Sequence, residues 1–232
     1  DWFRWLVKSG ELAGNPAADL ELPRVPRRRL PQVLSAAEVE TILAQPDVET
    51  EMGLRDRALL EVLYASGIRR RELTRLSVFD VDHGRGTLFV RQGKGRKDRV
   101  VPLGERALAW VRKYLDEVRE RWLANPQETA VFLSQEGTAI SVERLSALVR
   151  GYVKRSGVGK PGACHLFRHA AATAMLENGA DIRFIQAMLG HASLRTTEVY
   201  THVSIEALKA VHAATHPGAK LKRKTEDDCG AA

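Results

Sequence analysis

Apolar residues recur at steps of three and four along much of the chain, the spacing that gathers side chains on one face of an α-helix. Leu108, Val111, Leu115, Val118 and Trp122 form one such face, and they predict a long amphipathic helix with its apolar side in the core. The same spacing predicts further helices at about 54–65, 70–76, 141–154, 165–178, 181–189 and 204–214.

Polar residues and glycines mark where several of these helices begin and end. Ser35 followed by Glu38 is a capping box, in which each side chain bonds to the other residue's backbone N–H at the start of a helix. Gly67 and Gly190 each follow a helical pattern, and glycine is favoured at that place because it adopts left-handed backbone angles without strain. We expect a helix to begin after Ser35 and others to end at the two glycines.

Between residues 78 and 103 the period changes from about 3.6 to two, which is typical of strands. Residues 87–90 and 99–103 predict two strands of a hairpin, joined through a glycine-containing turn at 93–96. The apolar run 131–133 is too short to assign. The predicted fold class is therefore mostly α with a small antiparallel β-sheet (α+β).

Composition divides the chain into four segments. Residues 1–22 read as the end of a helix followed by a turn, and 23–34 form a linker rich in proline and arginine. Residues 35–217 carry the helical and strand patterns of the main domain. Residues 218–232 are highly charged and contain few large apolar residues, and they are expected to be disordered. Because the chain starts without Met inside a helical pattern, we expect it to be truncated.

The charge balance favours a polyanion as partner. The 232 residues include 36 Lys+Arg against 29 Asp+Glu, a net charge of +7, which favours nucleic acid or an anionic membrane surface. A basic protein with neither partner is the plainer alternative. No segment has the roughly 18 consecutive apolar residues that a membrane-spanning helix needs, and the N-terminus has no signal or lipidation motif. The two cysteines, Cys164 and Cys229, form no disulfide framework or zinc set, so a cytoplasmic location is expected.

Several residue pairs could carry chemistry on phosphate. His165 and Arg168 lie three apart on a predicted helix and therefore share a face, where a guanidinium fork and an imidazole suit a phosphate. His191 and Tyr200 follow the next helix and could reach the same cleft. Taken singly, each of these residues is more often an ordinary surface or core residue.

Basic residues cluster in three further places, each of which is either a DNA-contacting surface or a solvated one. Arg69 lies at the break between two helices, where its side chain can face a cleft, and Lys94 lies at the predicted hairpin turn. The predicted DNA-contacting residues are Arg27, Arg28, Arg29, Arg70, Arg71, Arg96 and Lys97.

Together these motifs resemble the tyrosine recombinase (phage integrase) family, most closely the bacterial Xer recombinases. The resemblance runs from about residue 1 to 217, with five motifs in the family's order. The motifs are Gly67-Ile68-Arg69 with Glu72-Leu73, Gly93-Lys94-Gly95 with Val101-Pro102-Leu103, His165-x-x-Arg168-His169, Leu189-Gly190-His191, and Tyr200-Thr201-His202.

The resemblance implies a role for each matching residue. It implies that Tyr200 is the nucleophile that cleaves DNA and forms a 3′-phosphotyrosyl bond. Arg69 and Arg168 would hold the phosphate, and Lys94 would protonate the leaving 5′ oxygen. The remaining implied roles are phosphate binding and base catalysis by His165, phosphate binding by His191, and support of Arg69 by Glu72.

The resemblance also implies an assembly and a setting. It implies a tyrosine recombinase catalytic-domain fold over 35–217, with 1–22 the remnant of an N-terminal helical domain that helps to clamp DNA. The implied reaction needs no metal, ATP or other cofactor. The implied partner is double-stranded DNA near the nucleoid, bound by a homo- or hetero-tetramer in which the C-terminal helix docks on a neighbouring protomer; packing on its own core is the alternative.

Other functions remain open from the sequence. A type IB topoisomerase uses similar chemistry to relax DNA, and an accessory protein would bind DNA without cleaving it. A general adaptor for RNA or membranes would require the five motifs to be a coincidence. The sequence does not identify the DNA target.

Overall fold

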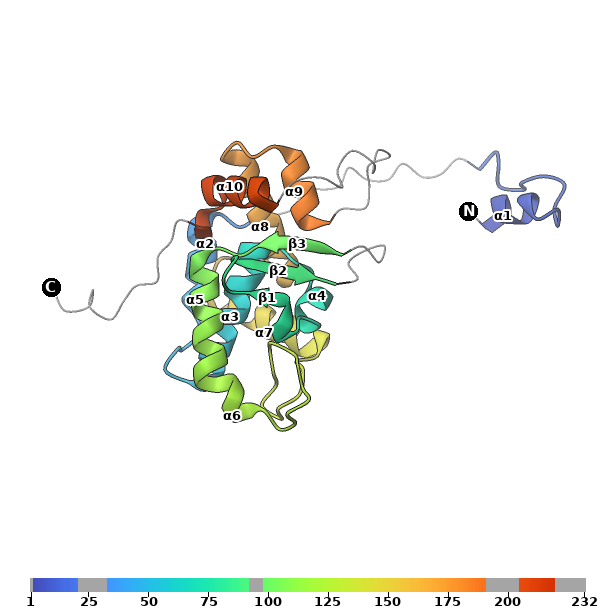
Figure 1. The fold of residues 1–232 in the computed structure, drawn as a ribbon. Helices are drawn as coiled ribbons and strands as arrows, with labels where there is room; N and C mark the ends of the chain where they lie inside the picture. The colour runs from blue at the N-terminus through green and yellow to red at the C-terminus, as the bar shows by residue number, and fades with distance from the viewer. Residues whose placement is uncertain (1, 21–32, 92–97, 191–204, 220–232) are drawn as a thin grey trace. The chain divides into compact units, whose positions relative to one another are not determined.

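The chain divides into two compact units, Asp1–Gln32 and Val33–Ala232 (Figure 1). In the first unit, Trp2 and Trp5 stack with ring centroids 5.5 Å apart and stay exposed, and helix α1 (Trp2–Lys8) has no buried residue. The hydrophobic core therefore belongs to the second unit. The computed structural model describes residues 2–20, 33–91, 98–190 and 205–219.

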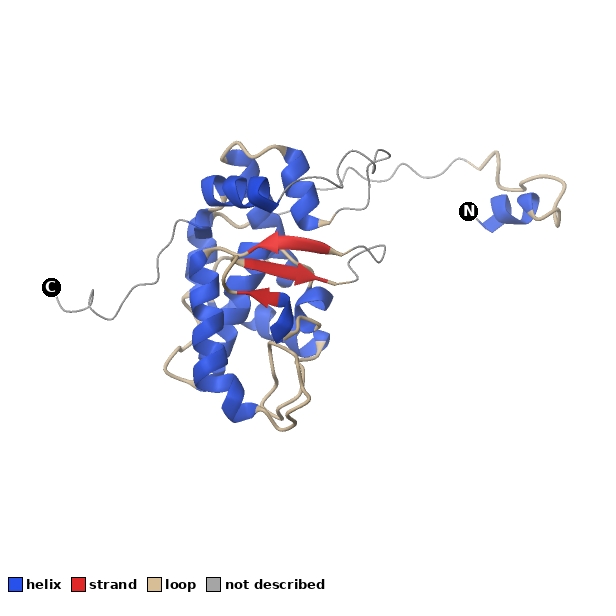
Figure 2. Cartoon of the chain, viewed as in Figure 1, coloured by secondary structure: helices blue, strands red, loops and turns tan. Residues whose placement is uncertain are grey.

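The second unit is mainly helical with one small antiparallel sheet, which confirms the predicted fold class (Figure 2). Its α-helices are α2 (Ala36–Leu43), α3 (Glu51–Ser66), α4 (Arg70–Thr74), α5 (Glu105–Tyr114), α6 (Glu120–Trp122), α7 (Val142–Arg155), α8 (Cys164–Glu177), α9 (Ile182–Leu189) and α10 (Ile205–Thr215). The other elements are the 3₁₀ helices η1 (Val78–Asp80) and η3 (Pro217–Ala219), the π-helical segment η2 (Leu115–Arg119), and strands β1 (Val81–Asp82), β2 (Thr87–Val90) and β3 (Arg99–Pro102).

Helix α3 runs through the centre of the core. Leu59, Leu60, Val62 and Leu63 are fully buried and lie on several of its faces, because α5 packs on one side and α8 on another. A helix surrounded in this way needs apolar residues all round rather than a single stripe. In the described parts of the chain, no helix is long and apolar enough to cross a membrane.

The helix start after Ser35 and the helix ends at Gly67 and Gly190 are confirmed, whereas α3 begins three residues before the predicted 54 and α4 ends two residues before the predicted 76. Ser35 Oγ accepts from Glu38 N, and the Glu38 carboxylate accepts from Ser35 N, which is the expected capping box. Gly67 ends α3 with φ of +58°, and Gly190 ends α9 with φ of +62°. Both glycines therefore have the left-handed backbone conformation that other residues rarely adopt.

The sheet has the order β1-β2-β3, with each neighbouring pair antiparallel. The predicted strands pair with Leu88 opposite Val101, and both side chains face the core. Strand β1 was not predicted, because two residues are too few to show a period. Strand β3 lies at the edge of the sheet that contacts α9 and α10 (Figure 1).

The predicted helix around 108–122 is formed by α5, η2 and α6 in succession. Trp122 is partly buried against the core, as its place in the stripe predicts. The unassigned run 131–133 forms no strand: Leu133 makes an isolated β-bridge with Ala139, and the preceding Ala130 makes another with Ser77.

The last residues of the predicted linker pack in the second unit. Leu34 is 3% exposed and Val33 packs against the core. Lys160 Nζ donates to the Val33 carbonyl at 2.8 Å and also pairs with Glu38. The chain entering α2 is thereby tied to the segment that precedes α8.

A buried carboxylate in α3 is held by two arginines. Glu61 is 1% exposed, and its carboxylate accepts from Arg57 Nε and Nη2 at 3.0 and 2.8 Å and from Arg106 Nε at 2.9 Å. Arg57 Nη1 also donates to the Leu43 carbonyl at 2.8 Å. A buried charge of this kind is tolerated because it is both paired and hydrogen-bonded.

The end of α10 and the residues after it close the core at the C-terminal end of α3. His212 Nε2 lies 2.8 Å from the Ala65 carbonyl, and His216 Nε2 lies 2.9 Å from the Tyr64 carbonyl. Gly218 N donates to His216 Nδ1 at 3.0 Å, so this imidazole is neutral, accepting at Nδ1 and donating at Nε2. Burial, with further contributions from His212 and Arg106, lowers the pKa of His216 to about 3.

This geometry makes the stability of the second unit depend on pH. An unfolded histidine binds a proton below about pH 6.5, whereas His216 resists protonation until about pH 3. The stabilisation is therefore complete above pH 6.5 and is lost as the pH falls from 6.5 towards 3. We expect His216 to contribute a loss of about 2 kcal/mol in the free energy of unfolding between pH 7 and pH 5, measured by urea denaturation.

The control is His216→Gln, whose side-chain amide can still donate to Tyr64 but does not titrate. Its free energy of unfolding should fall less over the same pH range. Equal pH slopes for the two proteins would show that the neutral imidazole is not the cause.

Candidate active site

Arg69 lies at the junction between two helices, as its position after Gly67 predicts. Helix α3 ends at Gly67, α4 begins at Arg70, and Arg69 is the N-cap residue between them. The Glu72 carboxylate accepts from the Arg69 backbone N–H at 2.8 Å, which fixes the first turn of α4. The short helix therefore holds the Arg69 side chain in a defined direction.

The Arg69 guanidinium connects α4 to the end of α9. Its Nη1 donates to Glu72 Oε1 at 2.8 Å, and its Nη2 donates to the Gly190 carbonyl at 2.7 Å. The side chain is 27% exposed. A guanidinium has five N–H donors, so two bonds leave donors available for an anion.

Arg168, on α8, also binds the end of α9 and connects it to the end of α3. Its Nη1 donates to the Gly67 carbonyl at 2.6 Å, and its Nη2 donates to the Leu189 carbonyl at 2.7 Å. The last carbonyls of a helix lack partners within the helix and carry a partial negative charge, so a guanidinium is well suited to them. Burial, and then the charges of Arg69 and Arg99, lower the pKa of Arg168 to about 10, which still leaves it protonated at neutral pH.

Arg99 is a third arginine at this place, and the sequence analysis did not single it out. It is the first residue of β3, and its side chain is only 11% exposed. Its Nη1 and Nη2 donate to the two Glu72 oxygens at 3.1 and 2.7 Å, and its Nε donates to the Met188 carbonyl at 2.9 Å. The sequence signal that indicates a buried position for Arg99 is its register in the strand, because residues two apart share a face and Val101 faces the core.

Among the described residues, Glu72 is the one carboxylate that lies between these three arginines. Burial acts to raise its pKa, but hydrogen bonds and charge from Arg99 and Arg69 outweigh it and lower the pKa to about 2. Glu72 is therefore ionised at any physiological pH. Three guanidinium groups and one carboxylate leave an excess of positive charge, which favours an anion such as a phosphate.

His165 lies in the first turn of α8, one turn before Arg168, and it is exposed. Its ring lies edge-on to that of His169 at 6.0 Å between centroids. Burial, with the charges of His165 and Arg168, lowers the pKa of His169. The structure thus places an imidazole on the same helix as Arg168, at the spacing that the sequence predicts.

Three predicted catalytic residues, Lys94, His191 and Tyr200, lie outside the described residues. So do the predicted DNA-contacting residues Arg27, Arg28, Arg29, Arg96 and Lys97. Their roles stay predictions.

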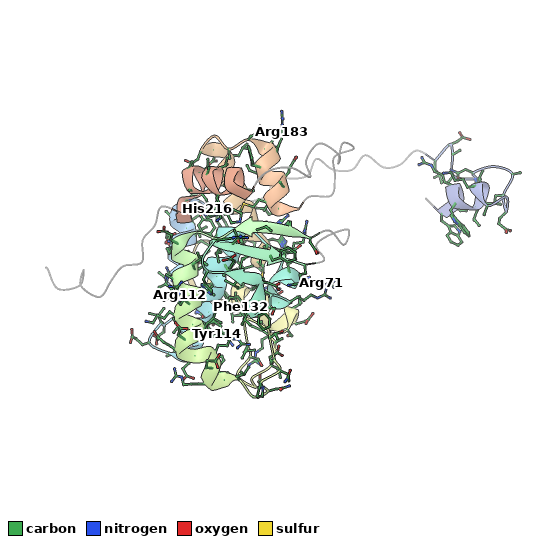
Figure 3. All side chains as sticks on the ribbon, in the orientation of Figure 1. Arg71, Arg112, Tyr114, Phe132, Arg183 and His216 are labelled. Carbon is green, nitrogen blue, oxygen red and sulfur yellow. The ribbon has the colours of Figure 1, made fainter. Side chains whose placement is uncertain are left out.

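The remaining predicted DNA-contacting residues are exposed on α4. Arg70 Nη1 donates to Ser146 Oγ on α7 at 3.2 Å. Arg71 is exposed and points outward from α4 (Figure 3). Neither Arg70 nor Arg71 is among the arginines that bind Glu72 in the described part of the chain.

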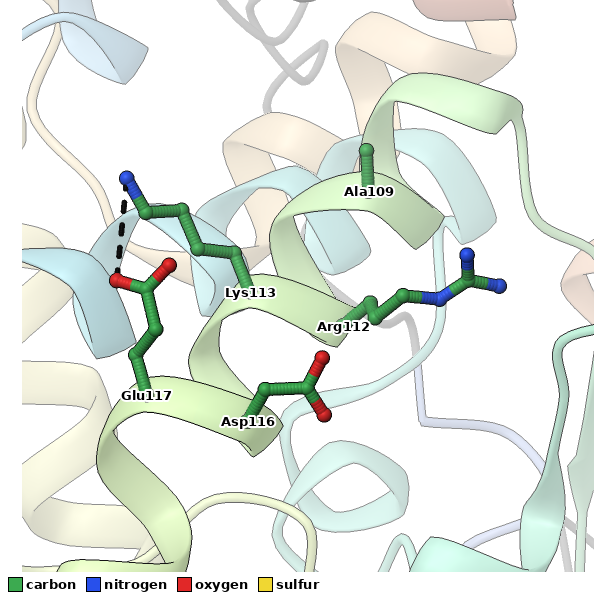
Figure 4. Close-up of a pocket in the computed structure, with 5 residues that line it drawn as sticks. All are labelled: Ala109, Arg112, Lys113, Asp116 and Glu117. Atoms are coloured by element: carbon green, nitrogen blue, oxygen red, sulfur yellow. Dashed lines mark ion pairs between the residues drawn. The ribbon is translucent and has the colours of Figure 1, made fainter.

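A separate surface depression lies along α5 and η2 (Figure 4). Its charged lining includes an ion pair between Lys113 Nζ and Glu117 Oε2 at 3.9 Å, a helical i,i+4 pair. None of the predicted site residues lines it. Among the described residues, no three His, Cys, Asp or Glu side chains form a group able to hold a metal ion.

Comparison with known proteins agrees with the motifs. A family model described as the phage integrase family matches residues 32–206. The chain is 52% identical over 223 residues to "Tyrosine recombinase XerC 2" of Ralstonia nicotianae, covering 96% of this chain and 64% of that protein. The chain therefore spans less than two thirds of that relative's length.

Solved structures give the same result for the fold. A XerA recombinase matches with a TM-score of 0.64 and 31% identity, over 83% of this chain and 66% of that one. The XerH site-specific recombinase, in a pre-cleavage complex with its difH substrate, matches with a TM-score of 0.62 and 26% identity, over 83% of this chain and 56% of that one.

The environment of Glu72 generates a prediction about stability. Replacing Glu72 with alanine leaves Arg69 and Arg99 without their shared carboxylate in a largely buried place. Breaking a buried ion pair from one side typically costs about 3–5 kcal/mol, and we expect a loss of that order in the free energy of unfolding, measured with urea.

Glu136→Ala is the matched control, because Glu136 pairs with Arg144 at 2.9 Å but both side chains are exposed. An exposed pair contributes little to stability, because water and salt screen it, so this variant should lose much less than Glu72→Ala. Similar losses in the two variants would contradict the account of Glu72.

Proposed function

The chain belongs to the phage integrase family of tyrosine recombinases, and we propose that it is a site-specific recombinase that cleaves and rejoins DNA through a 3′-phosphotyrosyl intermediate. The observation that carries this proposal is the placement of Arg69 and Arg168. Two guanidinium groups from separate elements both bind the end of α9, and each is also fixed at a second point, Arg69 by Glu72 and Arg168 by the end of α3, with donors left over. Such an arrangement suits one phosphate held from two sides.

The proposed reaction exchanges one phosphate ester for another. The Tyr200 oxygen attacks the phosphorus and gives its proton to His165, the proposed base, and the bond from phosphorus to the 5′ oxygen breaks. Lys94 protonates that oxygen, which would otherwise be a poor leaving group. Because the phosphotyrosyl ester keeps the bond energy, the reverse attack by a 5′ hydroxyl rejoins DNA without ATP.

The arginines supply the electrostatic part of the mechanism. A phosphodiester carries one negative charge, and attack by Tyr200 develops a second in the transition state. Donors that are already in place when this charge develops lower the barrier without reorganisation. Arg69 and Arg168 are held in this way by helix carbonyls, and His165 adds a donor from the first turn of α8.

The positive charge of the cluster also explains why the proposed reaction needs no metal. Metal ions serve phosphoryl transfer by neutralising charge on the phosphate oxygens. Three arginines around Glu72 leave enough positive charge to do so without one. The same cationic field favours the ionised form of a tyrosine, whose pKa is ordinarily about 10.

Double-stranded DNA is the proposed partner, and the complex of XerH with its substrate supports this choice. Arg70 and Arg71, exposed on α4 beside the cluster, are proposed to contact the backbone. We further propose that four protomers act together. The described end of α10 packs on α3 of its own chain, and docking in trans would place a neighbour's α10 in that same position.

The covalent step can be tested without knowing the target sequence. A pool of nicked duplexes with randomised sequence should yield protein–DNA adducts that survive SDS, and sequencing the attached DNA gives the target. Tyr200→Phe should abolish the adducts and leave DNA binding nearly unchanged, because it removes the nucleophilic oxygen and little else. EDTA should have no effect.

Absence of adducts with the unaltered chain would favour a protein that binds DNA without cleaving it. Adducts accompanied by relaxation of arbitrary supercoiled plasmid, with no recombinant product, would favour a topoisomerase. Strong inhibition by EDTA would contradict the metal-free mechanism.

The arginine clamp generates a second prediction. Arg168→Ala should slow adduct formation by about 10²–10³-fold, the usual effect of removing one transition-state donor, while the affinity for DNA changes much less. Single-turnover rates at saturating DNA measure the effect. Arg112→Ala is the control, because Arg112 is an exposed arginine on α5 outside the cluster (Figure 3), and an equal loss there would refute the assignment.

A further inference from the structure

We propose that Arg99 is a positioning residue of the active site, which holds Arg69 in place through Glu72 and fixes the end of α9. The proposal rests on the function proposed above and adds a residue to it. Arg99 comes from β3, whereas Arg69 and Glu72 come from α4. The contact therefore ties the edge of the sheet to the helix that carries the phosphate-binding arginine.

The hydrogen bonds of Arg99 account for all three of its guanidinium nitrogens. Nη1 and Nη2 bind the two Glu72 oxygens, and Nε binds the Met188 carbonyl. With all three nitrogens bonded to protein groups and its side chain only 11% exposed, against 27% for Arg69, Arg99 is less well placed than Arg69 to contact a phosphate. Its influence must pass through the groups that it holds.

Glu72 is the first of these groups. It receives Arg99 on one side and Arg69 on the other, and Arg168 adds charge from α8. The carboxylate is thus fixed by the Arg99 fork and by Nη1 and the backbone N–H of Arg69, and its remaining freedom to rotate is small. Because Arg69 Nη1 binds the same Glu72 oxygen as Arg99 Nη1, a shift of Glu72 would move the Arg69 guanidinium with it.

The end of α9 is the second group. Arg99 binds Met188, Arg168 binds Leu189, and Arg69 binds Gly190, so three successive carbonyls each receive one arginine. A Cβ on residue 190 would lie 3.1 Å from Arg99 Nη1. Gly190 is therefore required both for its left-handed conformation and for the close approach of Arg99.

Lysine could not replace Arg99 in this role. A carboxylate and a carbonyl lie in different directions from the side chain, and only the planar fork of arginine can bind both Glu72 oxygens and still donate from Nε. Lysine keeps the charge but binds as a single point. The pair Arg99→Lys and Arg99→Met therefore separates the geometric contribution of Arg99 from its charge.

Arg57 offers a matched control elsewhere in the fold. It also binds a buried glutamate with two nitrogens and a backbone carbonyl with the third, and its side chain is 16% exposed. Its partners, Glu61 and Leu43, lie outside the candidate active site. Arg57→Met thus removes the same kinds of bonds and should destabilise the fold without disturbing the phosphate clamp.

The test compares the full chain with Arg99→Met, Arg99→Lys and Arg57→Met, using a nicked duplex recovered from the adduct pool. Adduct formation is followed in single turnover at saturating DNA, below the unfolding temperature of every variant. A misplacement near 1 Å typically slows catalysis about 10²-fold, and we expect Arg99→Met to slow cleavage by that factor while the Kd for DNA changes less than about threefold. Arg99→Lys should be nearly as slow, and Arg57→Met should cleave at the rate of the unaltered chain.

The pH profile provides a readout that a purely structural role would not alter. Glu72 faces Arg69 from its own junction, Arg99 from β3 and Arg168 from α8. Without Arg99, burial raises the pKa of Glu72, because a main source of compensating charge is gone. The cleavage rate of Arg99→Met should therefore fall further as the pH is lowered from 7 to 5. Over the same range, the cleavage rate of Arg57→Met should change as that of the unaltered chain does.

Four outcomes decide the matter. Cleavage by Arg99→Met at the rate of Arg57→Met would overturn the proposal, as would a defect confined to the Kd. If Arg99→Met does not fold, cleavage by Arg99→Lys at the rate of the unaltered chain would overturn the proposal. If the unaltered chain forms no adduct, the proposed function itself fails, and the proposed role of Arg99 fails with it. This result differs from one in which the unaltered chain and Arg99→Met both form adducts at the same rate, which overturns only the role of Arg99.

Discussion

The candidate site depends on one interaction, the binding of arginine side chains to the carbonyl ends of two helices. Helices α3 and α9 both end at a glycine with a left-handed backbone. Arg168 bridges these ends by donating to Gly67 and Leu189. The terminal carbonyls need donors, and the buried guanidinium needs acceptors, so each satisfies the other. The contact that stabilises the fold therefore also orients the proposed phosphate-binding group.

The same constraint explains why positive charge can accumulate in a partly buried place. Three arginines with one carboxylate would repel one another without compensation. Glu72 offsets one charge, and the helix ends contribute partial negative charges along the directions in which Arg69 and Arg168 point. Part of the positive charge remains uncompensated. A phosphate entering the site would supply the missing anion, which links binding of substrate to relief of this repulsion.

Local sequence rules found the parts of this site that local geometry determines. The capping box at Ser35 and the helix stops at Gly67 and Gly190 follow from backbone conformation, and the motif order identified Arg69 and Arg168. Arg99 was missed because its partners Met188 and Glu72 are 89 and 27 residues away in the sequence. No pattern along a strand shows that an inward-facing arginine will meet a carboxylate from a distant helix.

Long-range contacts determine other features of the fold as well. The pairing of His216 with Tyr64 spans 152 residues, and nothing near His216 in the sequence indicates a buried neutral imidazole. Strand β1 is two residues long and exists because β2 offers it partners. The helical stripe around 108–122 predicted the helix but not its π-helical middle. In each case the element is determined by tertiary packing rather than by its own residues.

The central claim is that the fixed arginines act on the negative charge of the scissile phosphate. The most direct measurement is the cleavage rate of Arg168→Ala, relative to the unaltered chain, on a duplex with a methylphosphonate at the scissile position. This group is uncharged, so there is less negative charge for Arg168 to stabilise. The account predicts that the rate deficit of Arg168→Ala shrinks strongly on this substrate. An equal deficit on the phosphate and the methylphosphonate duplexes would contradict it.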